Sequence, residues 1–201
     1  MAGETANYHE TRDPFFQSAD FTAVSPLATS ISIIPILRVP STSLAFPAGY
    51  WQKPGRRWEI SMWGRMTTAV TPGNITVELR HQTGAAPTDA GGTILATSAA
   101  IVAGASKANV TWRARFVIMA RGEGSTFVPT ATPLMAYGEF VPEPSSVVFP
   151  AANNPCFLPA TAPAAVNVDV TLAGTIHVDM KRSGSTAETI QVHDLHVSAM
   201  T

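Results

Sequence analysis

Residues 109–121 restrict the fold more than any other stretch, because two sets of side chains alternate along their whole length. The apolar set is Val110, Trp112, Ala114, Phe116, Ile118 and Ala120. In a helix these side chains would point in every direction, whereas in a strand they all share one face. The stretch therefore predicts a long β-strand with one face in a hydrophobic core.

The same period of two occurs on both sides of a proline–glycine pair. The side chains predicted to point inward are Trp58, Ile60 and Met62 before the pair, and Ile75, Val77 and Leu79 after it. Pro72 and Gly73 suit the two central positions of a type II turn. Residues 56–81 are therefore predicted to form a strand, a turn and a second strand.

Two stretches near the C-terminal end also alternate. Residues 166–180 predict one strand that bends or bulges at Gly174, with inward side chains at Val166, Val168, Val170 and Leu172. Within residues 189–199 the apolar side chains change parity part-way along the stretch. A change of parity by one residue predicts a β-bulge near His193 and Asp194.

The remaining pattern indicates an all-β sandwich. Shorter strands are expected at 31–39, 42–46, 93–97, 99–102 and 134–141, the first of them an edge or bulged strand because it contains Pro35. The Pro- and Ala-rich residues 142–163 predict a long connection across one end of the sandwich. About eight to ten antiparallel strands with this turn spacing favour a jelly-roll-like sandwich over residues 31–201.

Residues 1–30 differ from the rest, because their aromatic side chains follow no helical or strand period. A solvated terminus would gain nothing from these apolar groups, so we expect an extended arm that docks on a neighbour or partner. A frayed terminus is the alternative. The predicted contact residues of the arm are Tyr8, Phe15, Phe16 and Phe21.

The composition favours assembly. Of 201 residues, 45% are hydrophobic but only 13% are charged, against the roughly 25% usual for soluble domains. A surface this poor in charge favours burial against other copies or a larger assembly, although a monomer rich in surface Ser and Thr fits too. The net charge of −1 predicts no nucleic-acid partner. Without a secretory signal or a membrane-spanning stretch, the chain is expected to be made in a cytoplasm and to have no membrane partner.

No metal or other cofactor is expected. Cys156 stands alone among apolar neighbours, which predicts an inert buried thiol. His193 and His196 form the only close histidine pair, but residues three apart on a strand face opposite sides. His177 and Asp179 would complete a metal site only if the two C-terminal strands paired.

No enzyme activity is expected either. A glycosidase needs two carboxylates across a cleft, about 5–10 Å apart. Glu59 and Glu78, on neighbouring predicted strands, and Glu139 and Glu143 are the candidate pairs. Each occupies a position where an outward strand residue would be charged in any case, and no nucleophile elbow or phosphate loop occurs.

The aromatic residues support a second hypothesis, carbohydrate binding. Trp58 and Trp112 share the parity of the inward faces and are assigned to the core. Tyr50, Trp51 and Trp63 are predicted to be exposed, where they would offer faces to a sugar or to another subunit.

Three segments carry a resemblance to a known group of proteins. They are residues 54–65 (PGRRWEISMWGR), 71–77 (TPGNITV) and 182–194 (RSGSTAETIQVHD). Together they resemble small structural proteins encoded among tailed-bacteriophage head genes. The resemblance covers most of residues 50–198 and its motifs are turn and strand signatures, so no functional residue is carried over.

The resemblance implies a virion protein that decorates or stabilises the capsid. We therefore predict a non-enzymatic homotrimer, made in the host bacterial cytoplasm, that binds the major capsid protein with residues 1–30 as its clasp. The same fold serves in collars, tail fibres and receptor-binding tips. The alternative is thus a tail or fibre sandwich that binds host-surface carbohydrate.

Overall fold

The computed structural model of the protein describes residues 21–22, 30–32, 45–83, 91–121, 128–142, 156–182 and 189–200. Sheet A contains β1 (Phe21–Thr22), β4 (Arg57–Thr67), β8 (Val110–Ala120), β9 (Thr132–Pro142), β10 (Cys156–Leu158), β11 (Ala165–Val168) and β13 (Thr189–Met200). Sheet B contains β2 (Ser30–Ser32), β3 (Ala45–Phe46), β5 (Asn74–Thr83), β6 (Thr93–Thr97), β7 (Ile101–Val102) and β12 (Gly174–Arg182). Two 3₁₀ turns complete the described elements, η1 (Tyr50–Gln52) and η2 (Pro129–Ala131).

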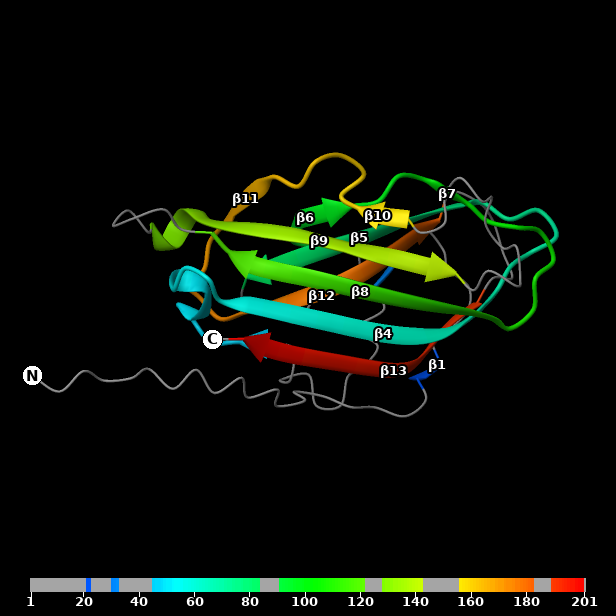
Figure 1. The fold of residues 1–201 in the computed structure, drawn as a ribbon, viewed down its shortest axis with the longest axis horizontal. Coiled ribbons are helices and arrows are strands. Elements are labelled where there is room, and N and C mark those ends of the chain that lie inside the picture. Colours follow the sequence, from blue (N-terminus) through cyan, green and yellow to red (C-terminus); the bar gives the residue numbers. More distant parts are fainter. Residues whose placement is uncertain are drawn as a thin grey trace, which may run out of the picture.

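The two sheets pack face to face as a sandwich. The strand order is β1-β13-β4-β8-β9-β10 in sheet A, where β11 also pairs with β9, and β2-β12-β5-β6 in sheet B, where β3 and β7 pair with β12 and β5. In Figure 1 the long strands β13, β4, β8 and β9 lie in front of β12 and β5. Every pairing is antiparallel. The predicted all-β sandwich is confirmed.

The core lies between the inner faces, as the alternation predicts. Its largest fully buried side chains include Trp51, Trp58, Trp112, Phe116, Phe140, Ile60, Leu79 and Ile176. The even-numbered residues of β4 and β8 point inward, and Ile75, Val77 and Leu79 of β5 meet them from sheet B. Each fully buried large side chain stabilises the fold by about 1.5–3 kcal/mol.

The segment between β4 and β5 is not the predicted type II turn. Gly73 is not among the described glycines with positive φ, which that turn requires at its second central position. Instead the chain passes from sheet A to sheet B, because β4 pairs with β8 and β13 while β5 pairs with β6 and β12. Alternation identifies the strands but does not show which strand each one pairs with.

The expected single strand over residues 166–180 is two strands in different sheets. β11 pairs with β9 in sheet A and β12 pairs with β5 in sheet B, so residues 169–173 cross between the sheets. Leu172, predicted inward, lies on this crossing and is 58% exposed. The two strands that follow β9, namely β10 and β11, both pair with β9, so the chain returns to sheet A after the expected connection instead of entering sheet B.

The predicted bulge in the last strand is confirmed. The pairing of β13 with β4 shifts register between Val192 and Asp194. Gly64 faces Val192 on β4, and a Cβ there would overlap the carbonyl oxygen of Gln191. Glycine at this position lets the bulged strand approach its neighbour closely.

Candidate functional site

The outer face of sheet A carries a groove that combines aromatic and charged side chains. It has a volume of about 580 Å³. Its lining comes from β4, β8, β9, β10 and the segment after β10, and consists of Arg57, Arg115, Val117, Tyr137, Gly138, Glu139, Phe157, Leu158, Pro159, Thr161 and Pro163.

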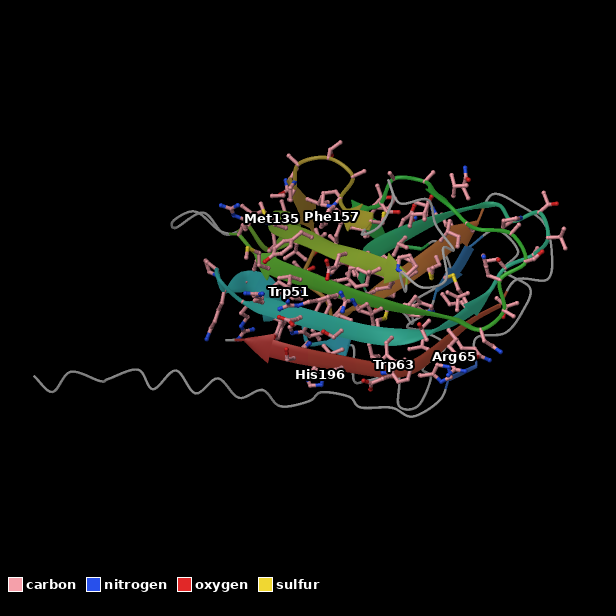
Figure 2. All side chains as sticks on the ribbon, turned by 45° about the vertical axis from the view of Figure 1, so that its right-hand side comes forward. Trp51, Trp63, Arg65, Met135, Phe157 and His196 are labelled. Atoms are coloured by element: carbon pink, nitrogen blue, oxygen red, sulfur yellow. The ribbon has the colours of Figure 1, made fainter. Side chains whose placement is uncertain are left out.

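Two aromatic residues form the apolar part of the groove. Phe157 is 62% exposed although it belongs to a strand, because Cys156 and Leu158 on either side of it point into the core. Tyr137 is half-buried on β9, two residues before Glu139, which pairs directly with Phe157. Figure 2 shows Phe157 beside β9 and β10.

Charged side chains border the aromatic pair. Arg115 Nε donates a hydrogen bond of 2.8 Å to Glu59 Oε1, and Arg57 Nη2 lies 3.6 Å from Glu59 Oε2. The hydrogen bond to Glu59, followed by its negative charge, raises the pKa of the Arg115 guanidinium above its usual range. Because the Arg115 side chain is 57% exposed, this pair contributes at most about 1 kcal/mol to stability. Its effect is to hold a planar donor group at the edge of the groove.

The other end of the same face carries a second exposed aromatic side chain. Trp63 on β4 is 45% exposed, as predicted, and its ring stacks on His193 of the bulge at 5.4 Å and 30°. Arg113 lies opposite Trp63 on β8, and Asp194 lies opposite it on β13. Figure 2 shows Trp63 and Arg65 at the β4–β13 side of the sheet, away from Phe157.

Tyr50 and Trp51 were both predicted to be exposed. The prediction is wrong for Trp51, and Tyr50 is only partly exposed. Trp51 is 0% exposed and packs edge-on against Phe46 and at a tilt against Trp58. Tyr50 is half-buried and its hydroxyl accepts a hydrogen bond of 2.8 Å from Trp58 Nε1. The preceding Gly49 has φ 73° and donates to the Val170 carbonyl oxygen, so η1 folds over one end of the core. A loop that closes a core looks like an exposed loop in the sequence.

Three of the four predicted arm contacts, Tyr8, Phe15 and Phe16, lie outside the described residues. The backbone of Phe21 is described, and it pairs with Val192 of β13 in the same chain. This pairing extends the edge of sheet A by two residues.

The structure separates the histidine and carboxylate candidates that the sequence analysis weighed for a metal or catalytic site. β12 and β13 belong to different sheets, so His177 and Asp179 cannot join His193 and His196. Within the described part of the chain, no three His, Cys, Asp or Glu side chains are arranged to hold a metal ion.

Glu59 and Glu78 are not on neighbouring strands, because β4 is in sheet A and β5 in sheet B. Glu78 is buried and is bound by Arg80 Nε at 2.8 Å and Lys181 Nζ at 2.8 Å. Glu143 lies outside the described residues. The structure instead places Glu59 and Glu139 on one face, on the two strands that flank β8.

Sequence reasoning missed Tyr137 and Phe157, although a signal was present. In β9 the buried side chains Leu134, Ala136 and Phe140 leave the odd-numbered positions on the outer face. Cys156 is buried as predicted, and burial raises the pKa of its thiol. The short alternation of residues 156–158 is the signal that places Phe157 outside.

No described helix is long and apolar enough to span a membrane. No protein-family model and no curated protein sequence matches the chain. Among solved structures, the CBM2 module of the evolved Dit protein of Lactobacillus casei BL23 phage J-1 is similar, at 9% identity and a TM-score of 0.31, over 78% of this chain and 68% of that one. The PL7 alginate lyase AlyA1 from Zobellia galactanivorans is similar at 9% identity and a TM-score of 0.24, over 77% of this chain and 64% of that one. TM-scores this low do not establish a common topology.

Proposed function

We propose that this protein is a non-enzymatic β-sandwich that binds carbohydrate in the groove on sheet A. The observation that carries the proposal is the placement of exposed Phe157 beside Tyr137 in a groove of about 580 Å³. Arg115 and Glu139 line the same groove.

This combination matches the chemistry of a sugar ring. The C–H face of a sugar is apolar and packs on an aromatic ring, while its hydroxyl groups need donors and acceptors at the edge. Arg115 supplies donors and Glu139 supplies acceptors beside the two rings. A purely apolar ligand would strip water from these charges without replacing the lost hydrogen bonds.

The groove supports binding better than hydrolysis. A glycosidase of the common type uses one carboxyl group as an acid and the other as a base or nucleophile, with both facing the glycosidic bond. Of the two carboxylates at the groove, Glu59 and Glu139, the first is held by both Arg57 and Arg115. We therefore propose recognition without bond cleavage.

The test is glycan binding by Phe157→Ala and Tyr137→Ala, with array screening followed by calorimetric titration of the strongest hit. Each variant should bind at least about tenfold more weakly, because an aromatic side chain at the centre of a site carries much of the binding energy. Leu172→Ala is the matched control, since Leu172 is 58% exposed and lies outside the groove. Unchanged binding by both groove variants would refute the proposal.

Capsid decoration is the second candidate. It is favoured by the low charged fraction of 13% together with exposed apolar side chains on several elements, namely Trp63, Val70, Val102, Phe157 and Leu172. In this function the protein is a virion subunit, a homotrimer that binds the major capsid protein and stabilises the shell through an interface present only after assembly.

Co-sedimentation with assembled capsids tests the second candidate. The full chain should pellet with the shells, and a chain without residues 1–25 should remain in the supernatant. Equal sedimentation of the two chains would exclude a clasp in that segment, and no sedimentation of either would exclude decoration of those shells.

A further inference from the structure

Two arginine side chains flank Trp63 on the outer face of sheet A. Arg113 is the cross-strand partner of Trp63 on β8, and Arg65 is the next outward-facing residue of β4. Both are exposed. Side chains directly opposite on neighbouring strands lie about 5 Å apart at Cβ, so the two guanidinium groups can reach a ligand that rests on the Trp63 ring.

These arginines differ from those of the groove in having no acidic partner. Arg57 and Arg115 pair with Glu59, whereas Arg65 and Arg113 make no ion pair with any acidic side chain among the described residues. The strand pairing places one carboxylate at this end of the face, that of Asp194, which lies opposite Trp63 on β13. Two guanidinium groups and one carboxylate leave an excess of positive charge.

Trp63 and the groove belong to one continuous surface. Phe157 on β10 and Trp63 on β4 are separated by β8 and β9, which corresponds to three interstrand spacings across the sheet; with an offset of two residues along the strand, the two positions lie about 16 Å apart. The register runs from Phe157 through Glu139 and Arg115 to Ser61, which is two residues from Trp63. A short oligosaccharide lying across the strands can therefore contact both ends.

We propose that the ligand is an anionic polysaccharide, with its sugar rings in the groove and an acidic group bound by Arg65 and Arg113. The inference rests on the proposed carbohydrate binding and specifies the class of carbohydrate. A guanidinium group binds a carboxylate or phosphate through two parallel hydrogen bonds, which makes this end selective for a charged sugar.

A single-stranded nucleic acid also combines rings with negative charge, but it fits this surface less well. Nucleic-acid sites stack successive bases on aromatic side chains and neutralise phosphate on every nucleotide. Here the aromatic residues at the two ends lie about 16 Å apart. Glu139 and Asp194 lie beside them, and the net charge of the chain is −1. A polysaccharide with spaced charges avoids repulsion by these carboxylates.

The experiment is titration of the full chain with hyaluronan, polygalacturonate, wall teichoic acid, carboxyl-reduced hyaluronan and oligothymidylate. At least one of the acidic polysaccharides should bind at least about tenfold more tightly than the neutral carboxyl-reduced polymer. The carboxylate- and phosphate-bearing polymers show which acidic group is preferred. Binding should weaken as salt increases, because exposed charges are screened.

The variant Arg65→Gln/Arg113→Gln should lose that preference and keep the weaker neutral binding. The single variant Arg113→Lys should keep only part of the preference for acidic polysaccharides, because an ammonium group cannot make the two parallel hydrogen bonds. Lys53→Gln is the control for the loss of a positive charge elsewhere on the protein, since Lys53 is exposed and does not line the surface. Far-UV circular dichroism verifies that each variant is folded.

The outcomes separate the two proposals. Equal binding of neutral and acidic polysaccharides, lost in Phe157→Ala but not in the double arginine variant, would overturn the anionic preference and leave carbohydrate binding intact. Arginine-dependent binding of oligothymidylate without binding of any polysaccharide would overturn both in favour of nucleic acid. Absence of binding to every probe would also overturn both.

Discussion

Two arginine side chains show how position decides the energetic role of an ion pair. Arg80 is 4% exposed; its Nε lies 3.2 Å from Asp179 Oδ2, and it also bonds Glu78 and the Gly91 carbonyl oxygen. Removing one partner of such a buried network costs about 3–5 kcal/mol, because it leaves buried charge uncompensated. Arg115 forms a pair with Glu59 but is exposed, so its loss costs at most about 1 kcal/mol. Arg80 serves the fold, whereas Arg115 is available to a ligand.

His81 is the buried titratable side chain with the clearest consequence for stability. It is 2% exposed and its ring stacks on Phe46 at 5.3 Å. Burial, followed by the nearby His177, lowers its pKa from 6.5 to about 4. Between these two values the unfolded chain binds a proton that the folded chain does not. The contribution of neutral His81 to the free energy of unfolding is therefore complete above pH 6.5 and decreases as the pH falls towards about 4.

We expect His81→Gln to reduce the acid sensitivity of the fold. The pKa difference corresponds to about 3 kcal/mol across the whole window, so the wild-type free energy of unfolding should decrease by nearly that amount on acidification. On acidification the free energy of unfolding of the variant should decrease by that much less than in the wild type, whatever the variant's stability at neutral pH. Urea unfolding near pH 7.5 and near pH 4.5 measures the difference. Equal decreases in both proteins would assign the acid sensitivity to other groups.

At the scale of elements, the bulge in β13 keeps both halves of the strand in the core. Ile190 and Val192 are buried before it, and Leu195 and Val197 are buried after it, at the opposite parity. If β13 paired with β4 over this sequence without a bulge, one half of the strand would turn its apolar side chains to the solvent. The bulge also places His193 against the Trp63 ring.

Deletion of His193 should leave the protein folded, because Val192 and Asp194 already pair with the adjacent residues Gly64 and Trp63 of β4. Without the extra residue the four apolar side chains fall on one face of a regular strand. His193→Ala is the matched control: it keeps the bulge and loses only the ring contact, at a cost of about 1 kcal/mol. Urea unfolding and amide exchange of β13 distinguish the two variants. A deletion variant that fails to fold would show that the close approach of the two strands at Gly64 requires the bulge.

At the scale of the whole molecule, the predicted assembly depends on surfaces that a single chain leaves open. The chain combines a 13% charged fraction with exposed Trp63, Phe157 and Leu172. Within the described residues, the N-terminal segment contributes β1, which pairs with β13 at only two positions, Phe21 and Thr22.

We expect a trimer by size exclusion with light scattering, both for the full chain and for a chain without residues 1–25. The truncated chain loses the β1 pairing, which should lower the free energy of unfolding by no more than about 2 kcal/mol, because each lost backbone hydrogen bond contributes roughly 1 kcal/mol. A trimer formed only by the full chain would make the segment an intersubunit clasp. A monomer in both cases would contradict the assembly prediction.

The amino-acid sequence by itself determined the strands and their inward faces. The alternation at β4, β5 and β8 depends only on local geometry, because successive side chains of a strand point to opposite faces. The bulge near His193 was predictable for the same reason, since a change of parity is visible along the chain. The buried state of Cys156 followed from its apolar neighbours.

Only the tertiary structure decided which strands became neighbours, and with them the site. The crossings after β4 and at residues 169–173 depend on contacts between residues distant in sequence, which alternation does not encode. The groove exists because β10 pairs with β9 and brings Phe157 beside Tyr137. Trp51 is buried because η1 folds over the end of the core. A side chain's face is a local property of the strand, whereas its neighbours are a property of the completed sandwich.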